Sequence, residues 1–103
     1  MKFGLSEEII VKINTVFVKY PAIKKVIIYG SRAKGNYKNG SDIDLTFIGE
    51  NMSDQDWTNI YFDLDDLLIP YSFDLSLLST IENPDLIDHI KRIGQVFYER
   101  EHT

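Results

Sequence analysis

Two aspartates separated by one residue are the first feature of this sequence that could do chemistry. Asp42 and Asp44 flank Ile43 in a stretch that alternates between polar and apolar residues. In a β-strand, alternation places both carboxylates on the same face. Aspartates are poor strand formers, and such a break in a local rule is typical of functional sites. Their carboxylate oxygens are suited to binding Mg²⁺ or Mn²⁺.

Asp74 repeats this anomaly later in the chain. It lies between Phe73 and Leu75 in a second alternating stretch, over residues 71–78. If the two strands are neighbours, Asp74 faces the same side as Asp42 and Asp44, and the three carboxylates repel one another unless a cation joins them. Two divalent ions bound there would serve in-line phosphoryl chemistry. The alternative for Asp74 is a solvated aspartate at the edge of a strand.

A glycine-serine pair precedes these carboxylates. Gly30-Ser31 follows an apolar run over residues 26–29, and Arg32 and Lys34 begin a basic, glycine-rich loop. Gly30 permits a tight turn, and we expect Ser31 to cap a short helix over 31–33 whose free N–H groups suit an anion. The order of strand, turn, basic loop and acidic strand predicts a site for a nucleoside triphosphate.

Two better-known phosphate loops are excluded. Gly30 and Gly35 have the glycine spacing of a Walker A loop, but Asn36 and Tyr37 stand where lysine and serine or threonine are required. The sequence also contains no G-x-G-x-x-G run, so a dinucleotide-binding fold is not indicated.

The remaining pattern predicts the elements that position these residues. We expect helices over 7–20, 54–68 and 84–93 and strands over 24–29, 42–48, 71–78 and 96–98, the last a short edge strand. Ser6, Ser53 and Asn83 are the predicted helix caps. The apolar stripe predicted for the second helix consists of Trp57, Ile60, Tyr61, Leu64, Leu67 and Leu68. His89 is expected on the solvated outer side of the last helix.

This order of elements predicts a protein of the α/β (α+β) class. Helices pack on a small mixed β-sheet, and residues 1–103 form a single domain. The chain has no cysteine, which excludes disulfides, and no apolar run approaches the roughly 18 residues that span a bilayer. We therefore expect no membrane association and a cytoplasmic location.

Charge is distributed unevenly along the chain. Residues 9–41 contain seven basic residues and no acidic one, whereas residues 42–90 contain twelve acidic residues and no lysine or arginine. This asymmetry suggests an anionic ligand on one side and a cation or basic partner on the other, and two solvated faces are the alternative. The net charge of −5 argues against stable nucleic-acid binding.

Together these motifs resemble the DNA-polymerase-β-like nucleotidyltransferase superfamily. Gly30-Ser31, a gap of ten residues, Asp42-x-Asp44 and a later strand aspartate occur in the family's order. The stretch from Gly30 to Leu45 is most similar to the GSRA-x-G…SDIDL signature of its minimal members, the MNT proteins. The resemblance covers most of the chain and implies a polymerase-β-like nucleotidyltransferase core.

The resemblance also implies roles for individual residues. Asp42 and Asp44 would bind the metal on the triphosphate, and Asp74 would complete a second metal site and help to activate the attacking hydroxyl. The cofactors would be two Mg²⁺ ions, or Mn²⁺, with ATP as donor. The residues implied in nucleotide binding are Gly30, Ser31, Arg32, Lys34 and Ser41.

Minimal members of this family are typically encoded beside a HEPN protein and act as its antitoxin. The resemblance therefore implies transfer of AMP from ATP to a tyrosine of a HEPN ribonuclease toxin, with the two proteins in a hetero-oligomer. Only about 25 residues follow Leu78, so the acceptor is expected to be small or to be presented by a partner. Two alternatives remain: an antitoxin that acts by binding alone, and a nucleotidyltransferase with a small-molecule acceptor.

Overall fold

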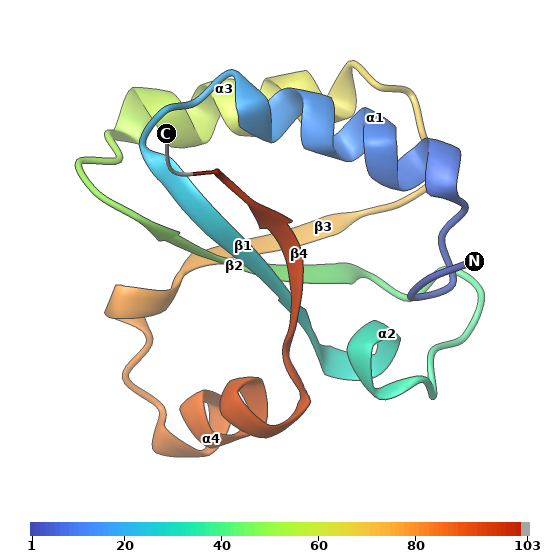
Figure 1. Ribbon diagram of the computed structural model, residues 1–103. Helices are drawn as coiled ribbons and strands as arrows, with labels where there is room; N and C mark the ends of the chain where they lie inside the picture. The colour runs from blue at the N-terminus through green and yellow to red at the C-terminus, as the bar shows by residue number, and fades with distance from the viewer. Residues whose placement is uncertain (102–103) are drawn as a thin grey trace.

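The sheet is built around the apolar strand β1 (Ile23–Tyr29), as Figure 1 shows for this computed structural model, which describes residues 1–101. β1 pairs antiparallel with β2 (Ile43–Gly49) on one side and with β4 (Gln95–Glu99) on the other. β3 (Phe73–Leu77) pairs parallel with β2, which gives the strand order β3-β2-β1-β4. The predicted mixed sheet and the predicted edge strand are therefore confirmed.

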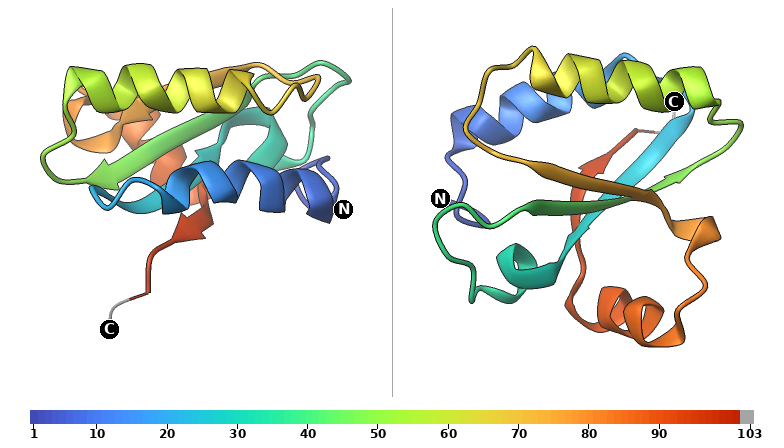
Figure 2. Two further views of the ribbon diagram at one scale, coloured as in Figure 1. Left: turned by 90° about the horizontal axis from the view of Figure 1, so that it is seen from above. Right: turned by 180° about the vertical axis from the view of Figure 1, so that it is seen from behind.

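Helices lie on both faces of this sheet. α1 (Glu7–Val18) and α3 (Asp54–Asp65) run side by side over one face, and α2 (Gly30–Lys34) and α4 (Pro84–Ile93) lie on the opposite side (Figures 1 and 2). A single 3₁₀ turn, η1 (Leu78–Thr80), links β3 to the loop before α4. Within residues 1–101, no helix is both long enough and apolar enough to cross a membrane.

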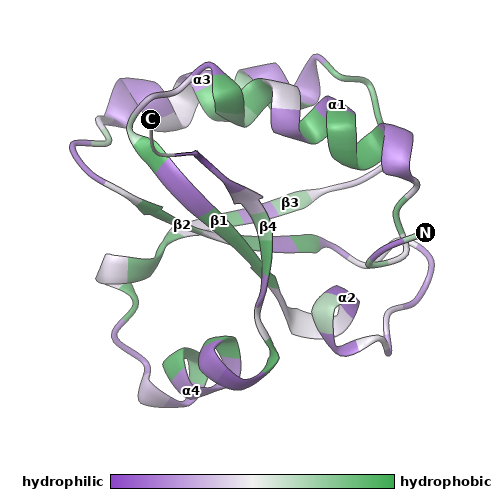
Figure 3. Ribbon diagram, in the orientation of Figure 1, coloured by the Kyte–Doolittle hydropathy of each residue, from purple (hydrophilic) through white to green (hydrophobic). Residues whose placement is uncertain are grey.

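The core lies between the sheet and the pair α1 and α3. Alternation along β2 turns Ile43, Leu45 and Phe47 to this face, where all three are fully buried. Phe17 of α1 packs edge-to-face on Phe47, with 5.3 Å between ring centroids. Polar and apolar residues alternate along α1 in Figure 3, as expected for a helix with one buried face. Alternation therefore leaves Asp44 on the opposite face of the sheet.

The predicted helix caps are confirmed. The Ser6 side chain accepts a hydrogen bond from the Ile9 N–H at 3.2 Å. Ser53 and Asp56 form a reciprocal capping box at the start of α3, with distances of 3.0 and 3.1 Å. Asn83 accepts hydrogen bonds from the backbone at the start of α4. These local contacts fix where three of the helices begin.

Several boundaries differ from the predictions. Asp42 lies just outside β2, which begins at Ile43, where the backbone N–H donates a hydrogen bond to the carbonyl of Ser72, just before β3. Ser31 lies within α2 and is not its cap, because the helix begins at Gly30.

The apolar stripe predicted for α3 is also too long. The helix ends at Asp65, and Leu68 has a left-handed φ of 54° and is 90% exposed. Tyr61 is 46% exposed, whereas Ile60 and Leu64 are buried. Residues beyond the last helical turn do not follow the helical period, so the periodicity of the sequence misplaced Leu68.

Candidate nucleotide site

Asp44 and Asp74 lie next to each other on β2 and β3. The two strands are parallel, and these aspartates are register partners. Both point away from the α1–α3 core, because the residues that follow them, Leu45 and Leu75, face that core and side chains alternate along a strand. The prediction that Asp74 shares a face with Asp44 is confirmed.

The next pair in the register consists of hydroxyl residues. Ser76 donates a hydrogen bond to the Thr46 hydroxyl at 3.0 Å, and these residues are register partners on β3 and β2. A polar strip therefore crosses this face of the sheet behind the aspartate pair.

The carboxylates affect one another electrostatically. Burial raises the pKa of Asp44 above its usual value, and the charges of Asp74 and Asp42 raise it further. The positive charge of Arg32 acts in the opposite direction. Asp42, although outside the strand, is thus close enough to act on Asp44. Negative charge is concentrated where a cation would relieve the repulsion.

The Gly30 turn lies against Asp44, one of these carboxylates. Gly30 has a φ of +75°, which favours glycine, and a Cβ built there would lie 2.2 Å from Asp44 Oδ2. Its neighbour Tyr29 is the register partner of Asp44 in the antiparallel ladder. The strand ladder therefore brings the predicted turn and the predicted metal-binding strand together, and a side chain at position 30 would have to displace the Asp44 carboxylate.

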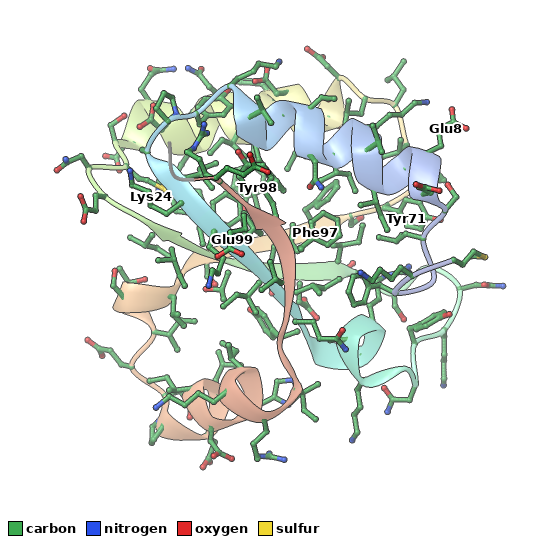
Figure 4. The ribbon with its side chains drawn as sticks, in the orientation of Figure 1. Glu8, Lys24, Tyr71, Phe97, Tyr98 and Glu99 are labelled. Carbon is green, nitrogen blue, oxygen red and sulfur yellow. The ribbon has the colours of Figure 1, made fainter. Side chains whose placement is uncertain are left out.

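Arg32 has a different environment from the one expected of a phosphate ligand. Its side chain is 3% exposed, and its guanidinium donates hydrogen bonds to the Ser41 carbonyl at 2.8 and 3.0 Å and to the Phe3 carbonyl at 3.0 Å. The same group lies over the rings of Tyr37 and Tyr71. Tyr71, which is labelled in Figure 4, belongs to the segment leading into β3. Arg32 therefore holds the loop that leads to Asp42.

The other predicted nucleotide ligands lie around the same loop. The Ser41 hydroxyl accepts a hydrogen bond from the Lys38 N–H at 2.8 Å, which closes the basic loop just before Asp42. Lys34 is exposed at the end of α2. Ser31 is half-buried in the first turn of α2, where helix geometry leaves backbone N–H groups without intrahelical partners.

His89 was predicted to be solvated, and this prediction is wrong. The residue is half-buried, and its Nε2 accepts a hydrogen bond from the Gly30 N–H at 3.0 Å. Its ring also lies edge-to-face on Tyr29, with 6.2 Å between centroids. Fifty-nine residues separate His89 from Gly30, so no local pattern in the sequence could have indicated this contact.

The donor set of the site suits a hard cation. Asp42, Asp44 and Asp74 offer only oxygen, the ligand atom preferred by Mg²⁺ and Mn²⁺. Over residues 1–101, no three acidic or histidine side chains are already arranged to enclose a metal ion. The three aspartates suit such an ion by their oxygen donors and negative charge, and not by a preformed arrangement.

The mixed sheet, with its glycine-serine turn against paired strand aspartates, agrees with the nucleotidyltransferase core that the sequence resemblance implies. The sequence profile described as polymerase beta, nucleotidyltransferase matches residues 11–103. This chain belongs to that family.

One curated relative is similar over part of the chain. A candidate protein adenylyltransferase of Methanocaldococcus jannaschii is 41% identical over 49 residues. The match covers 45% of this chain and about half of the relative's length.

Solved structures share the fold. A chain of a toxin–antitoxin assembly with AMP-PNP superposes with a TM-score of 0.68 at 19% identity, covering 94% of this chain and 76% of that one. The complex of a tri-AMPylated Shewanella oneidensis HEPN toxin with its MNT antitoxin gives 0.65 at 15% identity, with coverages of 93% and 74%. A candidate nucleotidyltransferase of Sulfolobus solfataricus gives 0.51 at 19%, with coverages of 94% and 92%.

Proposed function

We propose that this protein is a Mg²⁺-dependent nucleotidyltransferase antitoxin that transfers AMP from ATP to a tyrosine hydroxyl of a HEPN toxin. The observation that carries the proposal is the contact of the Gly30 turn with Asp44, beside its register partner Asp74. This arrangement supports the proposal, because the turn that would bind the phosphates lies against a carboxylate that would bind the metal of a nucleoside triphosphate.

The proposed reaction is an in-line displacement at the α-phosphorus of ATP. The acceptor hydroxyl oxygen forms a bond to phosphorus, and the bond from phosphorus to the pyrophosphate oxygen breaks. Asp74 is exposed and takes part in removing the hydroxyl proton, while pyrophosphate leaves toward the Gly30 turn.

Asp42, Asp44 and Asp74 would hold Mg²⁺ or Mn²⁺. When bound, two such ions would neutralise charge on the triphosphate and on the attacking oxygen. Asp44 must be ionised to bind a cation, and its raised pKa shows that the apoprotein disfavours this charged form. Metal binding would relieve that repulsion, so nucleotide and metal should stabilise the protein together.

The remaining residues divide into ligands and supports. The Gly30-Ser31 turn and the exposed Lys34 would contact the phosphates. Arg32 and Ser41 would not contact the nucleotide directly, because the Arg32 guanidinium already donates hydrogen bonds to the carbonyls of Ser41 and Phe3. Their contribution is to hold the loop before Asp42 in place.

The relatives support the partner and the transfer reaction that we propose. The AMP-PNP assembly and the complex with a tri-AMPylated HEPN toxin share this fold, and the archaeal relative carries an adenylyltransferase name. The chain itself offers an acidic helix, α3, with exposed Asp54 and Asp65 and with Asp66 exposed just after its end, which suits a basic partner surface.

Intact mass spectrometry tests the proposal. The purified chain is mixed with the HEPN protein encoded beside it, ATP and Mg²⁺, and both proteins are weighed. We expect the HEPN protein to gain one or more AMP units. Asp44→Asn should lower the rate at least about a hundredfold, because ligation at a metal site is worth several kcal/mol.

The Asp44→Asn control should remain folded, since the amide removes a charge that Asp74 and Asp42 repel. Its melting temperature in metal-free buffer should therefore not fall below that of the wild type. Stable complex formation without any mass gain would contradict transfer and indicate neutralisation by binding alone.

A further inference from the structure

The hydrogen bond between α4 and the Gly30 turn has no part in the function described so far. The Gly30 N–H donates to His89 Nε2 at 3.0 Å. A backbone N–H can only donate, so Nε2 is unprotonated and accepts. The first peptide of the turn is thereby held by a side chain from a distant helix.

The packing of α4 explains why His89 reaches this position. Its neighbour Ile90 is 5% exposed and packs against the sheet. At the end of the helix, Gly94 approaches β1 so closely that an added Cβ would lie 2.8 Å from Ile27 Cγ2. Asn83 caps the other end of α4. The C-terminal half of α4, which carries His89, is therefore packed against the sheet, and the Asn83 cap fixes where the helix begins.

The ring of His89 is fixed as well. Tyr29 is buried at 8% exposure, and its ring lies edge-to-face on the imidazole. The imidazole is therefore held by an aromatic contact on one side and a backbone hydrogen bond on the other. A solvated helix residue would make neither contact.

The consequence concerns the orientation of the turn. Gly30 has a left-handed φ of +75° and lies against Asp44. Because glycine has no side chain to restrict its backbone, this conformation depends on contacts from other residues. With the Gly30 N–H bound by His89, the N–H groups that follow it, from Ser31 onward, are the ones left to face a phosphate.

We propose that His89 is a positioning residue for the phosphate-binding turn: by accepting the Gly30 N–H, it fixes the Tyr29–Gly30 peptide and so orients the Gly30-Ser31 turn for the triphosphate. The proposal rests on the proposed function for its substrate, but the contact itself can be tested without any transfer reaction.

A matched pair of variants isolates the hydrogen bond. In His89→Gln, the amide oxygen lies as many covalent bonds from Cα as Nε2 does, so it can still accept from Gly30. In His89→Asn, the oxygen lies one bond closer and falls short. Lys91→Ala, an exposed change on the same helix, controls for general effects on α4.

Hydrogen exchange of the Gly30 amide, measured by NMR on the full chain, reads the contact directly. We expect exchange to be about three- to tenfold faster in His89→Asn and His89→Ala, as loss of one hydrogen bond implies, and near wild type in His89→Gln and Lys91→Ala. Equal exchange in His89→Gln and His89→Asn, at equal melting temperature, would overturn the proposal.

The kinetic readout separates positioning from general damage. Because the turn binds the phosphates in the ground state and the transition state alike, His89→Asn should raise the KM for ATP about three- to tenfold with little change in kcat. His89→Gln should restore the KM. A fall in kcat alone would contradict the role. If the wild type transfers no AMP, the proposed function fails, but hydrogen exchange still decides the role of His89.

Discussion

Gly30 is the residue at which the turn and the carboxylates meet. Its left-handed φ favours glycine, and a Cβ at this position would have to displace Asp44 Oδ2. Two independent constraints therefore act on a single position, and they can be separated experimentally. Gly35 has a φ of +93° but no heavy atom within 4 Å of an added Cβ, so it shares only the backbone constraint.

We predict that Gly30→Ala and Gly35→Ala will each destabilise the protein by about 1–2 kcal/mol, the usual strain of a left-handed alanine. Only Gly30→Ala should also abolish AMP transfer, because its methyl group displaces Asp44. Urea unfolding and the mass assay measure the two effects. Similar activity losses in both variants would show that backbone strain alone, and not the contact with Asp44, determines the effect.

At the scale of elements, α1 and α3 are joined by polar contacts as well as by the core. The Tyr20 hydroxyl, just after α1, donates a hydrogen bond to the Asp63 carboxylate of α3. Burial, together with this hydrogen bond, raises the pKa of Tyr20 from 10.0 to about 12. Lys19 also pairs with Asp63 at 3.5 Å. Part of the acidic face of α3 is thus used within the molecule.

The raised pKa of Tyr20 gives a signed pH prediction. Because the folded pKa lies above the unfolded one, this stabilisation is fully present below pH 10 and is lost as the pH rises to about 12. Tyr20→Phe should lower the free energy of unfolding by about 1 kcal/mol at pH 8.

The difference between wild type and Tyr20→Phe should shrink above pH 10, as measured by urea unfolding across that range. The Lys19–Asp63 pair is present in both proteins and so does not affect the comparison. A difference that stays constant up to pH 12 would show that the Tyr20 hydroxyl is not linked to Asp63.

At the scale of the whole molecule, Arg100, just after β4, connects the C-terminal part of the chain to the junction of α1 and β1. Arg100 donates hydrogen bonds to the carbonyls of Ile23, Tyr20, Val18 and Phe17, at 3.0, 2.9, 3.3 and 3.5 Å. These carbonyls belong to the end of α1, the turn that follows it and the start of β1. One guanidinium therefore supplies hydrogen bonds to the backbone carbonyls of the junction between α1 and β1.

We predict that Arg100→Ala will lower the free energy of unfolding by about 2–3 kcal/mol, since it removes charged donors from several carbonyls. Arg92→Ala, which breaks an exposed pair with Asp88 on α4, should cost about 0.5 kcal/mol or less. Urea unfolding of both variants tests the difference. Equal losses would mean that the junction does not depend on Arg100.

The sequence alone was sufficient for the features that depend on near neighbours. The alternation around Asp44 and Asp74 predicted which face each carboxylate occupies, because side chains in a strand alternate regardless of distant contacts. The caps at Ser6, Ser53 and Asn83 follow from hydrogen bonds spanning two or three residues. The glycine at position 30 indicated a turn for the same local reason.

The tertiary structure alone decided which of these residues meet. His89 and Gly30 lie 59 residues apart, and their contact depends on how α4 packs against β1. Arg32 looked like a phosphate ligand by its charge, but Phe3, Ser41 and the neighbouring aromatic rings enclose it. The physical reason is range: a short stretch of chain dictates its own alternation and caps, whereas burial and long-range hydrogen bonds arise only when separate elements pack together.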